Sequence, residues 1–545
     1  MKREKIIEGV IVRPQSREKF GARIVVAGQH IKSIVKDSTI KAPFILPGFI
    51  DSHLHIESSM LIPSRFAEMA VKHGTVAVVT DPHEVANVAG VEGIRFMVED
   101  SKTVPLKFFF GVPSCVPATP LEKSGATIDH QQVYELLSEP DFHFLAEMMN
   151  FPGVINNDRD VVMKLDAAKK LKKPVDGHAP GFTGEDLKKY VAAGISTDHE
   201  CSSIDEALER INFGQIIQIR EGSAARNFSS LAPLIAQHPE SLMFCTDDSH
   251  PDFLELGHIN KIVARAVAKG YDLFDVLNIA TQIPQKHYGF SLGKLEVNDL
   301  ADFIIVDNLQ DFNVLQTYID GSSVYRNKNI TFNLQDVPKP NYQFRTATPS
   351  IDDLRVVVQG NTMNVIEVFP DELITNWVKY PVSQNCGQEI NSMLNEDIIK
   401  IVLLNRYENT VPVVGFIKGF NLKRGAIAAS IAHDSHHILA IGANDESLVS
   451  TLKWIVSHRG GICFAENSVV DGIPLPYFGL MTDSNGQDVS TTYKKLNASI
   501  SKAGSKLNAP FMTASFMALT VIPFLKINHN GLFDVNKFIS VPLFN

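Results

Sequence analysis

Two histidines separated by one residue follow a short apolar run near the start of the chain. They are His53 and His55, in the stretch LPGFIDSHLHIESS of residues 46–59. Side chains in an extended strand alternate between its two faces, so these two imidazoles point the same way. Such a pair can hold one metal ion, whereas a pair of hydrogen-bonded surface histidines is the alternative for this motif on its own.

More ionisable residues stand at the ends of later apolar runs, and this recurrence favours the metal. The runs cover residues 49–53, 75–80, 106–112, 142–147, 174–178, 195–199, 215–220 and 242–246. At or just after their ends lie His53, His55, Asp81, His83, Glu84, Glu147, His178, His199, Glu200, Asp247 and Asp248. Ionisable groups are costly to bury unless they are paired or bound to a metal. One such residue alone would more simply be a hydrogen-bonded histidine or a helix cap, but the whole set predicts a catalytic site.

The elements that must position these residues are strands and helices in alternation. Segments between the runs, such as DRDVVMKLDAAKKLKK of residues 158–173, have apolar residues at helical spacing. This alternation predicts a parallel sheet, and eight units in roughly 200 to 250 residues predict a closed barrel with its active site at the carboxyl ends of the strands. An open doubly wound sheet is the alternative, but the sequence has no G-x-G-x-x-G loop.

We therefore predict an α/β protein with a (β/α)8 TIM-like barrel, a small β-sandwich domain that flanks it, and an α/β C-terminal domain. The small β domain is expected at residues 1–48 and 293–335, on either side of a metal-binding barrel at 49–292. The connection NLQDVPKPNYQ has the Pro and Asn content of a linker, and the C-terminal domain is expected at 345–545.

Composition and charge disfavour several other classes of protein. The 545 residues are 44% hydrophobic and 21% charged, which is a globular mix, and the formal net charge of -10 argues against a nucleic-acid partner. The charged N-terminus lacks the apolar run of a signal peptide, and no window is long and apolar enough for a membrane span. Five scattered cysteines fit a reduced, cytoplasmic protein without a disulfide framework.

Several blocks resemble the amidohydrolase superfamily of metal-dependent hydrolases, and most closely the adenine deaminases within it. The blocks are PGFIDSHLHIESSM, TDPHEVANVAG, AEMMNFPGV, DGHAPG and CTDD, followed in the C-terminal region by AHDSH and LPYFGLMTD. The resemblance covers nearly the whole chain. It implies a barrel inserted into a small β domain, and hydrolytic deamination of adenine to hypoxanthine and ammonia in purine salvage.

The resemblance also implies a centre of two divalent metal ions. His53, His55, Glu147 and Asp247 would hold the first ion, and Glu147, His178 and His199 the second. Hydantoinase-like relatives bridge two ions with a carbamylated lysine, but this chain has Glu147 at that place. Imidazole and carboxylate ligands suit Mn²⁺ or Fe²⁺, with Zn²⁺ as a further option.

The implied reaction is attack of a metal-bridged hydroxide on C6 of adenine. Asp247 is expected to take the proton of the water, and His83 to carry a proton to the ring or the leaving group, with Glu84 and Glu57 as substitutes. Glu200 is expected to orient His199. We expect Glu84, Asp248 and Ser249 to bind the substrate.

Two alternative functions stay open on these observations. A related deaminase or cyclic-amide hydrolase would share the metal ligands but act on another heterocycle. A catalytically silent barrel would show gaps in the ligand set, and the sequence has none. The stretch HDSHH, with His433, His436 and His437, would hold a third metal or pack at an interface or near the barrel mouth. We expect the protein to form a homodimer and to bind a small-molecule substrate. We expect no association with membranes.

Overall fold

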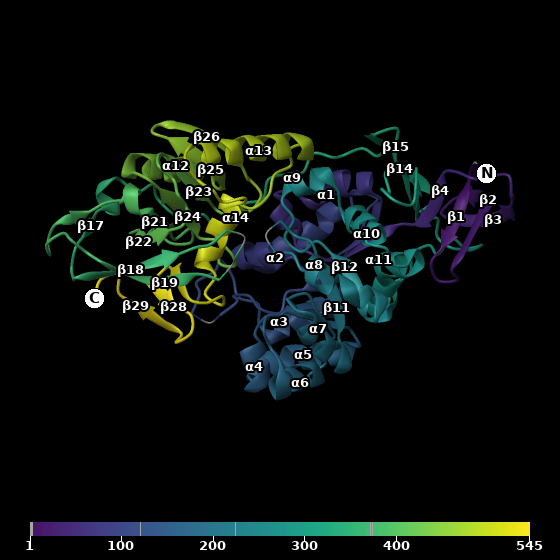
Figure 1. Ribbon diagram of the computed structural model, residues 1–545, viewed down its shortest axis with the longest axis horizontal. Coiled ribbons are helices and arrows are strands. Elements are labelled where there is room, and N and C mark those ends of the chain that lie inside the picture. The colour runs from purple at the N-terminus through teal and green to yellow at the C-terminus, as the bar shows by residue number, and fades with distance from the viewer. Residues whose placement is uncertain (1–3, 120, 224, 371, 373) are drawn as a thin grey trace. The chain divides into compact units, whose positions relative to one another are not determined.

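The computed structural model of the chain describes residues 4–119, 121–223, 225–370, 372 and 374–545. The chain forms two compact units, each built from several stretches of sequence. Unit 1 comprises Met1–Pro82, Arg95–Cys115 and Asp129–Val337, and unit 2 comprises His83–Ile94, Val116–Ile128 and Pro338–Asn545. Figure 1 labels the elements of both units.

A single eight-stranded sheet holds the first and last strands of unit 1. Its order is β16-β15-β14-β13-β4-β1-β2-β3. The strands are β1 (Lys5–Arg13), β2 (Glu18–Ala27), β3 (His30–Lys36), β4 (Phe44–Pro47), β13 (Phe303–Val306), β14 (Val314–Ile319), β15 (Ser322–Arg326) and β16 (Asn329–Ile330). Strand β4 pairs antiparallel with β13, and Ile11, Ile24, Ile45 and Phe303 fill the core of the sheet. The barrel is thus inserted into a small β domain.

Eight parallel strands in chain order form the barrel of unit 1 and fall on the eight predicted runs. They are β5 (Phe49–Leu54), β6 (Thr75–Thr80), β7 (Lys107–Val112), β8 (Phe142–Met148), β9 (Val175–Gly177), β10 (Thr197–Asp198), β11 (Ile216–Arg220) and β12 (Leu242–Cys245). Strands β5 to β9 form one sheet and β10 to β12 another. Parallel bridges from Val175 to Ile195 and from Leu54 to Asp247 join the two sheets into a closed ring. The predicted barrel is confirmed.

Buried apolar side chains hold the barrel strands in place and explain why the runs form strands. Strand β6, TVAVVT, is buried along its whole length, which is the pattern of a parallel strand covered on both faces. Val79, Phe144, Ala146, Met243 and Tyr288 from different elements pack together in one cluster. The fixed positions of these strands determine where the residues at their carboxyl ends lie.

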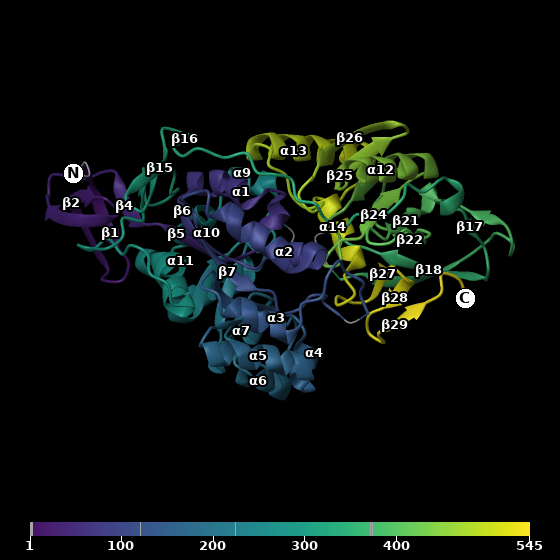
Figure 2. The ribbon, with the colours of Figure 1, turned by 180° about the vertical axis from the view of Figure 1, so that it is seen from behind.

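Helices follow the strands of unit 1, as the amphipathic segments predict. They are α1 (Pro63–Ala70), α3 (His130–Leu137), α4 (Phe151–Ile155), α5 (Arg159–Leu171), α6 (Gly184–Ala192), α7 (Ile204–Asn212), α8 (Phe228–Leu231), α9 (Pro251–Leu256), α10 (Ile259–Ala268) and α11 (Leu273–Tyr288). Helix α5 is typical: Asp158 caps its first turn, and Val161 and Leu165 are buried. Helices α3, α5, α6 and α7 lie together in both views (Figures 1 and 2).

An eight-stranded sheet forms the core of unit 2, in the order β19-β18-β22-β21-β24-β23-β25-β26. Its strands are β18 (Thr362–Glu367), β19 (Asn376–Pro381), β21 (Ile398–Leu404), β22 (Val413–Lys418), β23 (Ala426–Ala429), β24 (Ile438–Gly442), β25 (Gly461–Glu466) and β26 (Val469–Pro474). Smaller sheets pair β17 (Val356–Val357) with β20 (Glu389–Ile390), and β27 (Leu525–Asn528) with β28 (Gly531–Asp534) and β29 (Ile539–Val541). The helices are α12 (Asp445–His458), α13 (Gly486–Lys502) and α14 (Pro510–Ser515). Leu448, Leu452 and Ile455 of α12 pack against Val402 and Ala428 of the sheet.

Helix α2 (His83–Ser101) is divided between the two units. It is bent at Gly90, whose φ of 60° is outside the helical region, and residues up to Ile94 belong to unit 2. The second inserted segment meets this part of the helix where the backbone N–H of Gly125 donates to the carbonyl of Asn87 at 2.7 Å. A Cβ on Gly125 would lie 2.1 Å from the Val88 carbonyl oxygen, so this approach requires glycine.

Within the described ranges, no helix has the length and apolar character needed to cross a membrane.

Candidate metal centre

Six buried or half-buried residues from five strand ends meet in unit 1. His53 lies near the end of β5 and His55 follows that strand, Glu147 lies in β8, His178 follows β9, His199 follows β10, and Asp247 follows β12. His178 is the most exposed of them, with 22% of its side chain accessible. These are the six residues that the sequence analysis expects to hold metal, and the barrel brings them together because parallel strands end at one rim.

Glu147 lies between two groups of imidazoles. Its Oε1 is 3.5 Å from Nε2 of His55. Its Oε2 is 3.0 Å from Nδ1 of His178 and 3.2 Å from Nε2 of His199. Oε2 also lies 4.0 Å from Nε2 of His53. The carboxylate thus has one oxygen toward His55 and the other nearest to His178 and His199, an arrangement that suits a bridging carboxylate.

Asp247 presents its two oxygens to different partners. Oδ1 lies 3.5 Å from Nε2 of His53 and 3.3 Å from Nε2 of His55, whereas Oδ2 accepts a hydrogen bond from Arg220 at 2.6 Å. The backbone of Asp247 has a φ of 53°, in the left-handed region that aspartate tolerates better than most residues. Its N–H donates to the His53 carbonyl at 3.0 Å, so the residue also helps to close the barrel.

The histidine ring nitrogens have the roles that metal ligands need. Nδ1 of His55 lies 3.0 Å from the carbonyl oxygen of Asp81, which can only accept, so Nδ1 carries the proton and Nε2 offers a lone pair to the site. Both ring nitrogens of His53 and Nδ1 of His199 are buried without a hydrogen-bond partner among the described residues. Buried polar atoms of this kind need a partner, and a divalent cation at this place fits the donors present.

The charges of the site also suit a cation. Burial alone would raise the pKa of Glu147, but His178 and His199 hold it well below its usual range. Burial acts on Asp247 in the same sense, and Arg220 brings its pKa well below the usual range. Burial lowers the pKa of His53, which favours the neutral ring. His199 differs, because Glu147 and Glu200 raise its pKa despite burial, so a cation there competes with a proton.

Arg220 is a site residue that the sequence analysis missed. It is buried, and its guanidinium donates to both oxygens of Glu200, at 2.6 and 3.0 Å, as well as to Asp247. Glu200 in turn lies 3.4 Å from Nε2 of His199 and 3.5 Å from Nδ1 of His178. Arg220 is the last residue of β11, the same place at which other strands carry site residues, and that position was the available signal.

A second missed feature is a buried polar network beneath the histidine pair. Asp51 accepts from the backbone and the hydroxyl of Thr246, at 3.1 and 2.5 Å, and so ties β5 to the end of β12. Nε2 of His258 lies 3.0 Å from the same carboxylate, and Nδ1 of His258 lies 2.6 Å from the hydroxyl of Thr75. This network fixes the strand that carries His53 and His55.

The residues expected to contact substrate fall in both units. In unit 1, Asp248 accepts a hydrogen bond from the hydroxyl of Ser58 at 2.5 Å, and the adjacent Ser249 is buried. His83 and Glu84 form the first turn of α2 and belong to unit 2. His83 follows the end of β6 by three residues in the chain.

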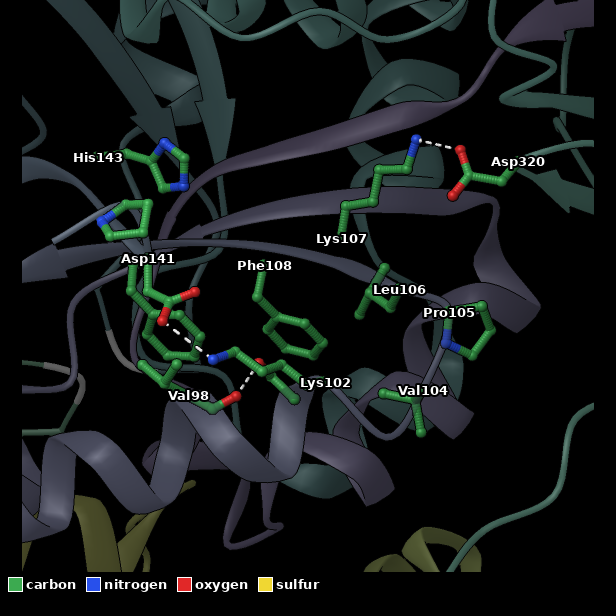
Figure 3. A pocket seen from close by; sticks show the side chains of 13 residues that line it. Val98, Lys102, Val104, Pro105, Leu106, Lys107, Phe108, Asp141, His143 and Asp320 are labelled. Atoms are coloured by element: carbon green, nitrogen blue, oxygen red, sulfur yellow. Dashed lines mark hydrogen bonds and ion pairs between the residues drawn. The ribbon is translucent and has the colours of Figure 1, made fainter. Parts of the chain in front are cut away.

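A cavity of about 300 Å³ lies elsewhere in unit 1 and is a different kind of feature (Figure 3). Its lining includes Lys107 at the amino end of β7 and Phe108 beside it. The two lysines drawn there are already paired, Lys107 with Asp320 at 2.8 Å and Lys102 with Asp141 at 3.0 Å. Since catalytic groups of a barrel gather at the carboxyl ends of the strands, this cavity does not belong to the centre.

A closed ring of eight parallel strands with histidines and carboxylates at its carboxyl rim defines a metal-dependent barrel enzyme. The sequence matches the Amidohydrolase family over residues 44–223 and 218–324, and the Adenine deaminase C-terminal domain over residues 372–539. This chain belongs to the adenine deaminase family within the amidohydrolases, a family of hydrolases that use divalent metal. The family expected from the sequence blocks is therefore confirmed.

Relatives named adenine deaminase match along almost the whole chain. The one from Methanosarcina mazei is 48% identical over 98% of this chain and 99% of its own length. Those from Sulfurovum sp. and Borreliella burgdorferi are 47% and 44% identical, over 96% of this chain in each case and 96% and 97% of their own lengths. Among solved structures, the β-aspartyl dipeptidase of Fervidobacterium islandicum AW-1 is 16% identical with a TM-score of 0.46, and the match covers 60% of this chain and 100% of that one.

Proposed function

We propose that this protein deaminates adenine hydrolytically to hypoxanthine and ammonia, as a step of purine salvage. The observation that carries the proposal is the position of Glu147, with one oxygen toward His55 and the other toward His178 and His199. Membership of the adenine deaminase family supports adenine as the substrate.

Two divalent cations would be held by His53, His55, Glu147 and Asp247 on one side and by Glu147, His178 and His199 on the other. When bound, such ions lower the pKa of a water molecule toward neutrality and so supply a nucleophile. The ligands are imidazoles and carboxylates, which favours Mn²⁺ or Fe²⁺ over metals that prefer thiolates, and Zn²⁺ is also compatible.

The protein residues manage the protons of the reaction. A C6–O bond forms, the C6–N bond to the amino group breaks, and the two protons of water end on N1 and on the departing ammonia. Asp247 is held ionised by Arg220, so it can accept the proton released by the attacking water. We assign to His83 the delivery of a proton to the ring or to the leaving group.

Substrate binding needs groups that recognise the purine edge. We assign this role to Glu84, Asp248 and Ser249. The hydroxyl of Ser58 holds Oδ1 of Asp248 at 2.5 Å, and this fixes the direction of the carboxylate. An ionised carboxylate can accept from the N–H groups of a purine.

We also propose that the enzyme works as a cytoplasmic homodimer. Cys115, Cys201, Cys245, Cys386 and Cys463 are all free thiols in the structure, which fits a reducing compartment. Sedimentation equilibrium of the purified chain measures the oligomeric state directly, and a monomer at micromolar concentration would contradict the dimer.

The proposed activity is tested by incubating manganese-loaded protein separately with adenine, adenosine, cytosine, guanine and a hydantoin. Ammonia release and chromatography of the products identify the substrate. We expect hypoxanthine from adenine in wild-type protein and none from Glu147→Gln at the same protein concentration. Ammonia from cytosine or guanine, or ring opening of the hydantoin, without turnover of adenine would assign the centre to another heterocycle.

A further inference from the structure

Unit 2 contains a buried carboxylate held between two imidazoles. Oε1 of Glu84, in the first turn of α2, lies 2.5 Å from Nδ1 of His433, and its Oε2 is hydrogen-bonded to Nε2 of His436. All three side chains are at least 96% buried. Nε2 of His83 lies 3.4 Å from the same Oε1, so the pair at the start of the helix meets the loop between β23 and β24.

The tautomer of His436 decides what kind of cluster this is. The backbone N–H of Ala432 donates to Nδ1 of His436 at 3.2 Å, so the lone pair of Nδ1 is occupied. In a neutral imidazole the other nitrogen then carries the proton, and burial lowers the pKa of His436 to about 4, which keeps the ring neutral. Nε2 is therefore a hydrogen-bond donor to Glu84 and has no lone pair for a metal ion.

The loop that carries the two imidazoles is itself held firmly. The hydroxyl of Tyr407 donates to the Ser435 carbonyl at 2.6 Å, and the His436 N–H donates to the Ala432 carbonyl at 2.7 Å. The ring of His433 stacks on Phe516 with centroids 4.7 Å apart. Donors on a rigid support can fix the carboxylate that they bind.

We propose that His433 and His436 are positioning residues: through two N–H donors they fix the carboxylate of Glu84, and thereby orient the neighbouring His83 for proton transfer. This inference rests on the proposed function, because it presumes that His83 carries a proton in the reaction. It gives the C-terminal part of the chain a task in catalysis, since residues 338–545 supply both donors.

The charge of Glu84 also supports hydrogen bonds donated by the imidazoles to the carboxylate. Burial alone would raise the pKa of Glu84, but His433, His436 and His83 hold it well below its usual range. An ionised carboxylate only accepts hydrogen bonds, so both loop imidazoles must donate. Hydrogen bonds to a charged group are stronger than those between neutral groups.

The test compares variants that keep or remove one donor. Asparagine places an amide N–H near the position of Nδ1, so His433→Asn can still donate to Glu84, whereas His433→Leu cannot. We expect kcat for adenine to fall about 10- to 100-fold in His433→Leu, the range for a hydrogen bond to a charged group, and to recover largely in His433→Asn. The exposed His458 of α12 provides the control, because His458→Asn touches none of these groups.

A double-mutant cycle separates positioning from general loss of structure. If His433 acts through His83, then His433→Leu should cost less than about twofold in a His83→Asn background. An equal loss in both backgrounds would overturn the inference while leaving the role of His83 intact. Full turnover in His83→Asn alone would instead overturn the proposed function of His83, whatever the His433 variants do.

Two further measurements show whether the variants are correctly folded and whether the cluster binds metal. Melting temperature and metal content must match wild type in His433→Leu, and if that variant fails to fold, the pair His436→Gln and His436→Met makes the same comparison at the other donor. Gln keeps an amide N–H near the position of Nε2, and Met removes it. A third equivalent of metal that disappears in Glu84→Gln would show that the cluster binds an ion and would overturn the hydrogen-bonded assignment.

Discussion

Arg220 donates to Oδ2 of Asp247 at 2.6 Å, and this contact leaves Oδ1 as the oxygen that faces His53 and His55. The guanidinium therefore decides which atom of Asp247 is available as a ligand. It also balances the charge of Glu200, which lies beside the other two imidazoles of the centre.

Replacing Arg220 with Met leaves two buried carboxylates without their cation. We expect a loss of about 3–5 kcal/mol in the free energy of unfolding, the usual effect of breaking a buried ion pair, together with a large fall in kcat. Arg220→Lys keeps the charge but lacks the several N–H donors of the guanidinium. Its stability and its kcat should lie between those of wild type and of Arg220→Met. Arg265→Met, at a half-exposed ion pair with Glu221, is the control. Wild-type stability in Arg220→Met would refute the role assigned to the contact.

The two-metal proposal predicts that activity returns to the apo-protein only as the second equivalent of metal is added. Glu147→Gln and His178→Asn should lose metal and activity together, because each removes a ligand of the second ion. Elemental analysis of active protein, with ammonia release on the same sample, is the measurement. Full activity at one tightly bound ion would exclude a bridging role for Glu147.

His83→Asn should keep both metal ions and lose most of its turnover. His83 has no place among the six ligand candidates, and general acid catalysis is typically worth about 10²- to 10⁴-fold, so kcat should fall within that range. Steady-state kinetics and metal analysis of one preparation distinguish the roles. A metal-free His83→Asn protein would make His83 a ligand.

We expect the enzyme to act on the free base and to discriminate against adenosine. An enclosed site that hydrogen-bonds the purine must accommodate a ribose on N9, and sites built on hydrogen bonds can reject a misfit by about 10⁴-fold or more. The measurement is kcat/KM for adenine and adenosine on the same preparation. Comparable values would show that the site is open at N9.

We expect the buried Glu122 of unit 2 to make the free energy of unfolding depend on pH. Burial and the nearby Asp434 raise its pKa to about 8, and it accepts a hydrogen bond from Thr520. Between the unfolded pKa near 4.5 and about 8 the folded state binds the extra proton, so stability falls as pH rises, by about 1.4 kcal/mol per unit at most. Glu122→Gln should therefore melt higher than wild type at pH 8 and closer to it at pH 5. A constant difference in melting temperature across that range would contradict the assignment.

The barrel and its ligand candidates were readable from the sequence for physical reasons. A strand buried on both faces reads as a nearly continuous apolar run, as in TVAVVT of β6, and ionisable side chains gather at the carboxyl ends of such runs. His53, Glu147, His178 and His199 all stand at such ends. Their recurrence at successive run ends predicts one rim of the barrel.

Contacts between distant parts of the chain left no such pattern. Glu84 and His433 are 349 positions apart, and nothing in the sequence around either residue indicates that the two are in contact. Arg220 closes an apolar run like the other site residues, but an arginine at that place is equally compatible with a side chain that extends to solvent. Only the folded structure shows that the guanidinium forms ion pairs with Glu200 and Asp247.

The division of helix α2 at its bend affects how the chain can fold during synthesis. Residues 83–94 and 116–128 belong to unit 2, whose remaining residues begin only at Pro338. At about 5–20 residues per second, the roughly 240 residues after Ile94 take about 12 to 50 s to leave the ribosome. For most of that time the first two segments of unit 2 lack most of their packing partners. All of unit 1 has been synthesised once Val337 is added, so its barrel does not depend on later residues. A gene truncated after residue 337 would still yield a chain whose two unit 2 segments lack their packing partners, and such exposed segments favour chaperone binding or aggregation.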